Sequence, residues 1–187
     1  MKLLDGARCY SAGPVEVDTD PVSWRDRIGT ILNKNIPHLK IWNPLIKPKW
    51  CTQITGADQR ADLKAFQSGV FESKSIAKNV EIREICLRLV SACDFIICKL
   101  GGKTVGTYEE LAHAAAMHKP VLFIGEIDSC WRFAQFSYGM SNPYFKDEQS
   151  VCDFLVNVDN GSQKVDNLAW IFLKDKWINH EYTIKSR

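Results

Sequence analysis

Residues 94–125 read DFIICKLGGKTVGTYEELAHAAAMHKPVLFIG, and this stretch decides the fold. It begins with Asp94–Cys98, which is apolar after its first residue, and ends with the apolar run Pro120–Gly125. Between them, Gly101-Gly102 breaks the chain and the alanine-rich segment Gly106–Met117 is typical of a helix. Continuously apolar strands are typical of a parallel sheet that is covered on both faces. The stretch therefore predicts a strand–helix–strand unit of an α/β fold.

The residues before this unit extend the same alternation of strands and helices. Two apolar runs, at 7–12 and 38–42, each stop at a proline turn and are predicted to be strands. Between them, Ser23 precedes apolar residues spaced as on one helix face, so we expect a helix with Ser23 as its N-cap. The members of that face are Trp24, Ile28, Ile31 and Leu32.

Periodicity is weak over residues 45–79, where we expect a long excursion with one helix around 58–67. From residue 79 onward a helical face returns, formed by Ile82, Ile85, Cys86, Leu89 and Cys93. Near the C-terminus, 148–156 is a helix candidate and 168–173 is either a strand or a helix. The sequence thus predicts one α/β domain with a Rossmann-like, flavodoxin-like parallel sheet and a C-terminal extension.

Composition excludes several classes of protein. The 187 residues are 45% hydrophobic and 25% charged, which argues against disorder, and a net charge of +2 argues against a dedicated nucleic-acid binder. No run approaches the roughly 18 apolar residues of a membrane span, and the N-terminus lacks the apolar region of a signal peptide. Seven cysteines without a C-x-x-C pair favour buried free thiols in a reducing compartment. We therefore expect a soluble cytoplasmic protein without a metal or cofactor.

Three clusters lie where strands are predicted to end, which is where open α/β sheets bind ligands: Tyr10–Pro14, Asn43-Pro44 and Gly101–Glu110. The third is a glycine-containing loop that enters a helix, an arrangement that favours anions such as phosphate. It matches neither the Walker loop nor the dinucleotide fingerprint. Thr107–Glu110 also fits a capping box, in which Glu110 would only fold back onto the helix start.

The clusters occur in an order that resembles the nucleoside 2-deoxyribosyltransferase family, including its nucleotide N-glycosidase relatives. The resemblance covers residues 7–125, with a weaker similarity at 131–142, and leaves 126–187 as a segment for subunit contacts and capping. The ordered segments are Tyr10-Ser11-Ala12-Gly13-Pro14, Trp24-Arg25, Asn43-Pro44, Ser91-Ala92-Cys93-Asp94, Gly106-Thr107-Tyr108-Glu109-Glu110-Leu111-Ala112 and Lys119-Pro120-Val121-Leu122.

The resemblance implies chemistry at C1′ of a 2′-deoxynucleoside or its 5′-monophosphate. Glu110 aligns with the nucleophile that displaces the base, and Tyr10 would hydrogen-bond that carboxylate. Asp94 would organise the site. The residues expected to contact substrate are Gly13 and Pro14 near the sugar or base, Asn43, Trp42 and Trp50 at the base, and Lys103, Thr104, Gly106 and Thr107 in the anion-favouring loop.

Three positions depart from the pattern of the family. Cys86 stands where the family usually carries an aspartate, and a neutral thiol cannot supply that charge. Thr104 stands where transferases of free nucleosides tend to have aspartate, so together with Lys103 it favours a 5′-monophosphate. Glu16 replaces an arginine common in nucleotide hydrolases and argues the other way. Whether the substrate is phosphorylated stays open.

By the same resemblance, a neighbouring subunit would complete each pocket through residues 133–139, with Gln135 and Ser137 as its polar candidates. We therefore expect a homo-oligomer that acts on a small nucleoside or nucleotide, without a nucleic-acid polymer or membrane as partner. Two alternatives remain. Gly101–Glu110 looks like a stretched form of the lysine-decarboxylase-like phosphoribohydrolase motif, and Cys86 is compatible with a catalytically silent nucleotide-binding module.

Overall fold

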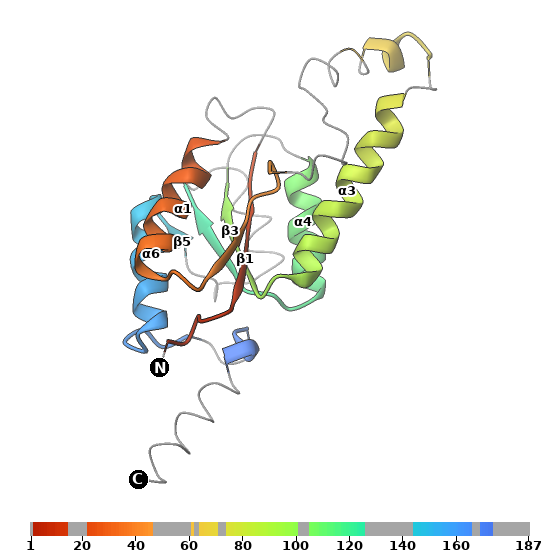
Figure 1. Ribbon diagram of the computed structural model, residues 1–187. Helices are drawn as coiled ribbons and strands as arrows, with labels where there is room; N and C mark the ends of the chain where they lie inside the picture. Colours follow the sequence, from red (N-terminus) through yellow and green to blue (C-terminus); the bar gives the residue numbers. More distant parts are fainter. Residues whose placement is uncertain are drawn as a thin grey trace, which may run out of the picture.

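The computed structural model describes residues 2–14, 22–46, 61, 64–70, 74–100, 105–125, 144–165 and 169–173. At its centre lies a five-stranded sheet in which every pair of neighbouring strands is parallel (Figure 1). The strand order, β2-β1-β3-β4-β5, is that of doubly wound flavodoxin-like sheets, which confirms the predicted fold class. The strands are β1 (Arg8–Ala12), β2 (Lys40–Trp42), β3 (Phe95–Lys99), β4 (Val121–Ile124) and β5 (Tyr144–Phe145).

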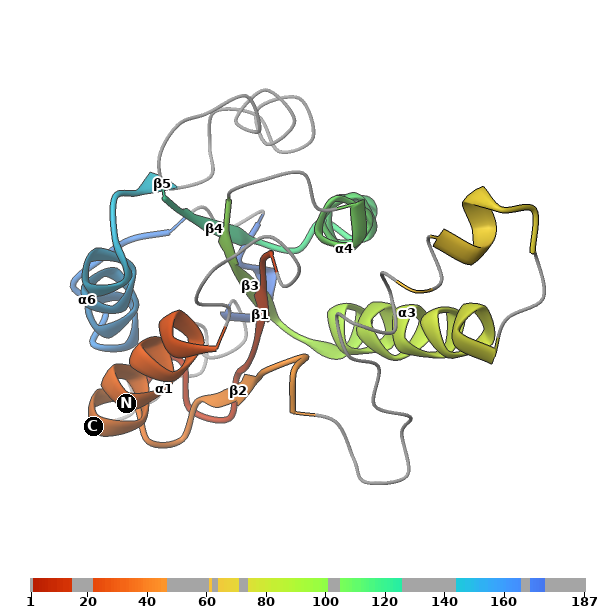
Figure 2. The same cartoon turned by 90° about the horizontal axis from the view of Figure 1, so that it is seen from above.

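Helices cover both faces of the sheet. Helices α1 (Ser23–Asn35) and α6 (Glu148–Asp159) lie on one face, and α3 (Lys74–Ala92) and α4 (Val105–Ala116) lie on the other (Figures 1 and 2). Alternate residues of β3 enter two separate cores. Phe95 and Ile97 pack on the α1/α6 face, whereas Ile96 and Cys98 pack on the α3/α4 face. Because both faces are buried, the strand needs no polar alternation, as its sequence indicated.

The described part of the C-terminal segment belongs to the α1/α6 core. Asp147 begins α6 with a capping box, in which its carboxylate accepts from the Ser150 backbone N–H at 2.8 Å. Trp170 packs against Phe95, with ring centroids 5.3 Å apart, just before a short 3-10 helix at Ile171–Leu173. The predicted helix at 148–156 therefore extends to residue 159. Residues 169–173 form a turn and this short helix, whereas Leu168 lies outside the described residues.

Some local predictions differ from the structure. Helix α1 begins at Ser23 itself with Val22 as N-cap and no side-chain cap, so the prediction that Ser23 caps the helix is wrong. The Ser23 hydroxyl instead accepts a hydrogen bond from Arg27 Nη1 at 2.8 Å. The helix predicted from residue 79 begins at Lys74, and the two-residue strand β5 was too short for its pattern to show. Half of the predicted helix at 58–67 lies outside the described residues, and the described residues 61 and 64–67 are helical.

Five cysteines lie in the described part of the chain, and all are free thiols: Cys9, Cys86, Cys93, Cys98 and Cys152. Four of them are buried, whereas Cys86 is half-buried. Burial raises the pKa of Cys93 to about 11 and that of Cys152 to about 12, so both thiols are neutral near pH 7. Among the described helices, none is long and apolar enough to cross a membrane.

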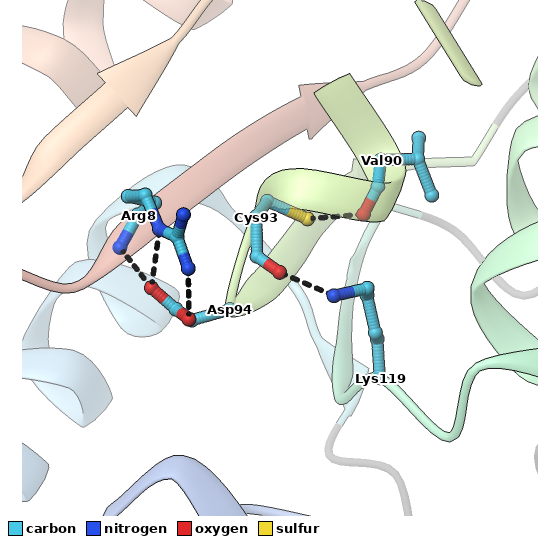
Figure 3. A network of polar contacts seen from close by, with 5 residues as sticks. All are labelled: Arg8, Val90, Cys93, Asp94 and Lys119. Atoms are coloured by element: carbon cyan, nitrogen blue, oxygen red, sulfur yellow. Dashed lines mark hydrogen bonds and ion pairs between the residues drawn. The ribbon is translucent and has the colours of Figure 1, made fainter. Parts of the chain in front are cut away.

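Asp94 ties the amino ends of two neighbouring strands together. Its carboxylate accepts hydrogen bonds from the Arg8 backbone N–H at 2.8 Å and from the guanidinium at 3.1 and 3.0 Å (Figure 3). Its own N–H donates to the Arg8 carbonyl at 2.7 Å. Next to it, the Lys119 ammonium donates to the Cys93 carbonyl (Figure 3). These contacts fix where α3 ends and where β1, β3 and β4 begin.

Because Asp94 holds these segments through charge-assisted hydrogen bonds, Asp94→Ala is expected to lower the free energy of unfolding by about 1–3 kcal/mol. Urea unfolding followed by circular dichroism measures the change. Asp153→Ala is the matched control, since the side chain of this exposed residue of α6 accepts a local bond from Gln149 and no other hydrogen bond within the described part of the chain. Equal stability of the two variants would contradict the proposed contribution of Asp94.

Candidate active site

The carboxyl ends of β1 and β3 are where the chain turns to opposite faces of the sheet. The chain leaves β1 for α1 on one face and leaves β3 for α4 on the other (Figure 2). In flavodoxin-like sheets, ligands bind at this switch point between the first and third strands. The structure therefore places a candidate site beside the segments after β1 and at the start of α4.

Tyr10 and Glu110 meet on the α3/α4 side of this position. The Tyr10 hydroxyl donates a hydrogen bond to Glu110 Oε1 at 2.6 Å, although the two residues are 100 positions apart in the chain. Tyr10 is fully buried in the middle of β1, and Glu110 is half-buried in the second turn of α4. The bond fixes the orientation of the carboxylate, because the tyrosine ring itself is held by the core.

Cys86 completes this cluster from a third element, α3. Its thiol lies within hydrogen-bonding reach of the Glu110 carboxylate and the Tyr10 hydroxyl, and its one proton can be donated to the carboxylate. The position at which the sequence departs from the family pattern is therefore in direct contact with the candidate nucleophile. A thiol donates only weakly, so it supports the carboxylate without adding a charge.

Opposing effects within the cluster set the pKa of the Glu110 carboxyl. Burial raises its pKa above the ordinary value of a glutamate, while the hydrogen bonds from Tyr10 and Cys86 and the positive charge of Arg25 act in the opposite direction. Burial, followed by the proximity of Glu110, raises the pKa of Tyr10 well above its ordinary value. Tyr10 therefore stays protonated and remains a donor to the carboxylate.

Glu109, the neighbour of Glu110, makes a different set of contacts. It accepts hydrogen bonds from the Arg83 guanidinium of α3, including one from Nε at 2.6 Å. Arg83 also pairs with Glu84 at 2.6 Å. Adjacent helical residues diverge by about 100°, so only one of the two glutamates can reach Tyr10.

The capping-box interpretation of Thr107–Glu110 is wrong. Helix α4 already includes Val105 and Gly106, so Thr107 is not its N-cap. Glu110 is bound to Tyr10 instead of folding back onto the helix start.

Gly13 and Pro14 are both buried immediately after β1. A Cβ added to Gly13 would lie 2.9 Å from Trp24 Cζ2 and 3.2 Å from the Lys99 carbonyl oxygen. Packing against α1 and β3 is therefore sufficient reason for a glycine here, independent of a ligand. Gly106 is exposed in the first turn of α4, and an added Cβ would meet no described residue within 4 Å other than its chain neighbours and the backbone of its own helix.

The structure does not bring every predicted residue to the cluster. Asp94 precedes β3 at the amino edge of the sheet, opposite the carboxyl ends, where it binds Arg8 (Figure 3). This contact gives Asp94 a structural role, whereas the resemblance had implied a role in the site. Asn43 follows β2 at the carboxyl edge, but its Oδ1 accepts a hydrogen bond from the Leu45 N–H at 3.0 Å in a local turn.

Thr107 is buried in α4. Trp42, also predicted to contact the base, is the last residue of β2. Five other predicted residues fall outside the described residues: Trp50, Lys103, Thr104, Gln135 and Ser137.

Arg25 is the charged residue whose relation to the site the sequence analysis missed. It is buried in α1 and lies on the same helix face as Ile28 and Leu32. The spacing of three and seven residues could have revealed this, because it places an arginine on the face that packs against the sheet. A buried arginine needs partners, so its position alone pointed to a specific contact.

The comparisons with known proteins find similar solved structures. No protein-family model and no curated protein matches the sequence. Among solved structures, the chain is similar to a conserved protein from Enterococcus faecalis V583, with a TM-score of 0.44 and 13% identity over 80% of this chain and 96% of that one. It is also similar to the CMP N-glycosidase BcmB of Clostridium botulinum, with a TM-score of 0.40 and 14% identity over 78% and 95% of the two chains. The fold assignment rests on the strand order.

The raised pKa of Glu110 has a consequence for stability. The pKa of Glu110 is higher in the folded protein than in the unfolded chain. When the pH rises above the pKa that Glu110 has in the unfolded chain, ionisation of this residue therefore favours the unfolded state and lowers stability. Glu110→Gln removes that penalty and keeps an acceptor for Tyr10. Its melting temperature is expected to exceed that of the wild type at pH 8, and the difference should disappear near pH 4.

Thermal unfolding at the two pH values measures this effect, with Glu109→Gln as the control. Glu109 is paired with Arg83 at the surface, so its replacement should bring no gain that grows with pH. A Glu110→Gln variant less stable than the wild type at pH 8 would show that its carboxylate stabilises the fold.

Proposed function

We propose that this protein cleaves or transfers the N-glycosidic bond of a 2′-deoxynucleoside or its 5′-monophosphate, with Glu110 as the nucleophile at C1′. The observation that carries the proposal is the hydrogen bond of 2.6 Å from the Tyr10 hydroxyl to the Glu110 carboxylate. It joins the two residues to which the family resemblance assigns the nucleophile and its orienting partner. Their position at the switch point of the sheet, where a small ligand binds in this fold, supports the same function.

The reaction proceeds in two steps that preserve the configuration at C1′. A Glu110 carboxylate oxygen forms a bond to C1′ while the C1′–N bond breaks, and the base leaves with that electron pair and takes up a proton. The resulting glycosyl ester is then opened by water, in a hydrolase, or by a second base, in a transferase. Tyr10 keeps the carboxylate aligned for attack and stays bound to it as the ester forms.

This role requires an ionised carboxylate, and the cluster supplies donors to it. Burial alone would favour the neutral acid, which cannot attack C1′. The hydrogen bonds from Tyr10 and Cys86 and the charge of Arg25 favour the ionised form. Since burial still raises the pKa of Glu110, the acid limb of kcat/KM should lie above the ordinary pKa of a glutamate.

The second candidate function is a catalytically silent module that binds a nucleotide. It is favoured by Cys86, because a thiol at this position cannot protonate a leaving base as an aspartic acid could. This module would bind nucleotides through the same carboxyl edge of the sheet without releasing the base. The phosphoribohydrolase alternative depends on residues 101–104, which lie outside the described residues.

A panel of nucleosides, deoxynucleosides and their 5′-monophosphates, with and without a free acceptor base, tests the proposed function by HPLC. Base release without acceptor identifies a hydrolase, and a new nucleoside formed only with acceptor identifies a transferase. Glu110→Ala should lower turnover by at least about 1,000-fold, since the covalent step is lost. Glu109→Gln removes a negative charge from the residue next to Glu110 and should keep its activity. Nucleotide binding without any turnover would favour the silent module.

Cys86→Asp and its neutral counterpart Cys86→Asn separate charge from shape at this position. A second carboxylate beside Glu110 would raise the pKa of Glu110, so the acid limb of kcat/KM should move to higher pH in the aspartate variant only. Above that limb, Cys86→Asp should be as active as the wild type or more active. Loss of activity across the whole pH range, in a variant that binds substrate normally, would mean that the thiol has a catalytic role of its own.

A further inference from the structure

Arg25 connects α1 to the segment that follows Tyr10. Its Nη2 donates to the Gly13 carbonyl at 3.0 Å and its Nε lies 3.4 Å from the Ser11 carbonyl. The guanidinium also stacks on the ring of Trp24, with its central carbon 4.3 Å from the ring centroid. Only 3% of Arg25 is exposed, so these contacts are made away from water. Arg25 therefore binds the main chain one and three residues beyond Tyr10.

The segment held by Arg25, residues 11–13, is also constrained by other neighbours. Trp24 fills the space beside Gly13, and the Ser11 hydroxyl donates to the Trp42 carbonyl of β2 at 3.1 Å. Residues 9–12 pair with β3. A displacement of the end of β1 would therefore have to break the Arg25 contacts first. Anchoring the end of β1 also holds Tyr10 in place, and this keeps its hydroxyl 2.6 Å from Glu110.

Arg25 also acts on Glu110 through its positive charge. Among the described residues, the groups that shift the pKa of the Glu110 carboxyl come from four elements: Tyr10 of β1, Cys86 of α3, Arg25 of α1 and Glu109 of α4 itself. Glu109 is negative and opposes ionisation of Glu110, but it is paired with Arg83. In this set, Tyr10 and Cys86 are uncharged donors, which leaves Arg25 as the positive charge. In a buried setting an opposite charge acts strongly, because water screens it little.

We propose that Arg25 is a positioning residue of this site, which anchors the end of β1 behind Tyr10 and supplies the positive charge that favours the Glu110 carboxylate. The inference rests on the proposed function only for the meaning of that carboxylate as a nucleophile. Arg25 does not reach the substrate in this role. It acts through Tyr10 and through the charge state of Glu110.

Two substitutions separate the parts of this role. Arg25→Gln removes the charge and keeps an amide donor, whereas Arg25→Lys keeps the charge and loses the planar fork. The titration midpoint of Glu110 is measured by NMR in protein labelled with ¹³C at the glutamate side-chain carboxyl, and its signal is assigned by its absence from Glu110→Gln. Lys99→Gln is the control, because Lys99 lies over the same Trp24 ring, 5.9 Å from the centroid.

We expect Arg25→Gln to raise the Glu110 midpoint by about one pH unit, and Arg25→Lys and Lys99→Gln to leave it unchanged. In the active enzyme, the acid limb of kcat/KM should follow the same order. Both arginine variants should lower kcat, by about tenfold, with little change in KM, because the anchoring of Tyr10 is weakened. A merely structural role would lower stability without moving the Glu110 midpoint.

An unchanged midpoint in folded Arg25→Gln would overturn the proposal. If that variant does not fold, Arg25→Lys decides, since a midpoint raised by about one unit despite the retained charge would also overturn it. The NMR titration needs no turnover, so it tests the role of Arg25 separately from the proposed function. A shifted midpoint in a protein that processes no substrate would support the role of Arg25 toward Glu110 and contradict the proposed function.

Discussion

The hydrogen bond between Tyr10 and Glu110 depends on the strand pairing around β1 and on the packing of the two helices on one face of the sheet. It joins the middle of β1 to the second turn of α4, and its length of 2.6 Å leaves little room for either element to shift. β1 is held by parallel pairing with β2 and β3, and α4 is packed against α3 on the same face. The pairing of β1 with β3, strands far apart in the chain, brings the two residues together. The candidate site is thus a consequence of the sheet order.

Burying a carboxylate opposes folding, and the surroundings of Glu110 offset only part of that effect. Desolvation raises its pKa, whereas two neutral donors and one buried cation act against desolvation. A fold selected for stability alone would place an apolar residue at this position. A carboxylate held half-buried, oriented and reluctant to ionise is typical of a site where charge is used in a reaction. This is the physical reason for treating Glu110 differently from the surface glutamate beside it.

The two edges of the sheet carry polar groups in different arrangements. At the amino edge, Asp94 forms a dense set of hydrogen bonds with Arg8 that ties β1 to β3. At the carboxyl edge, the polar groups come from strand β1 and from different helices and converge on one carboxylate. Asp94 was expected in the site because the family resemblance gives an organising role to an acidic residue at this strand start. The structure places it at the amino edge, bound to Arg8, whereas ligands of this fold bind at the carboxyl ends of the strands.

The sequence by itself determined the elements and the class of fold. Apolar runs such as 94–98 and 120–125 predicted buried parallel strands, and they are confirmed as β3 and β4, within a residue or two at each end. It also singled out Tyr10 and Glu110 as partners, through the order of motifs that the family resemblance supplied. Local patterns were sufficient to predict the elements, because strand burial and helix periodicity are properties of neighbouring residues.

Only the tertiary structure decided which polar residues meet. It brought Cys86 and Arg25 to Glu110 from two other helices, moved Asp94 to the opposite edge, and replaced the capping box by the bond to Tyr10. The local spacing of Thr107–Glu110 by itself favoured a cap and was also compatible with a site. The choice between them depended on a tyrosine 100 residues away, and contacts at that separation are set by how the strands pair, which no local pattern contains.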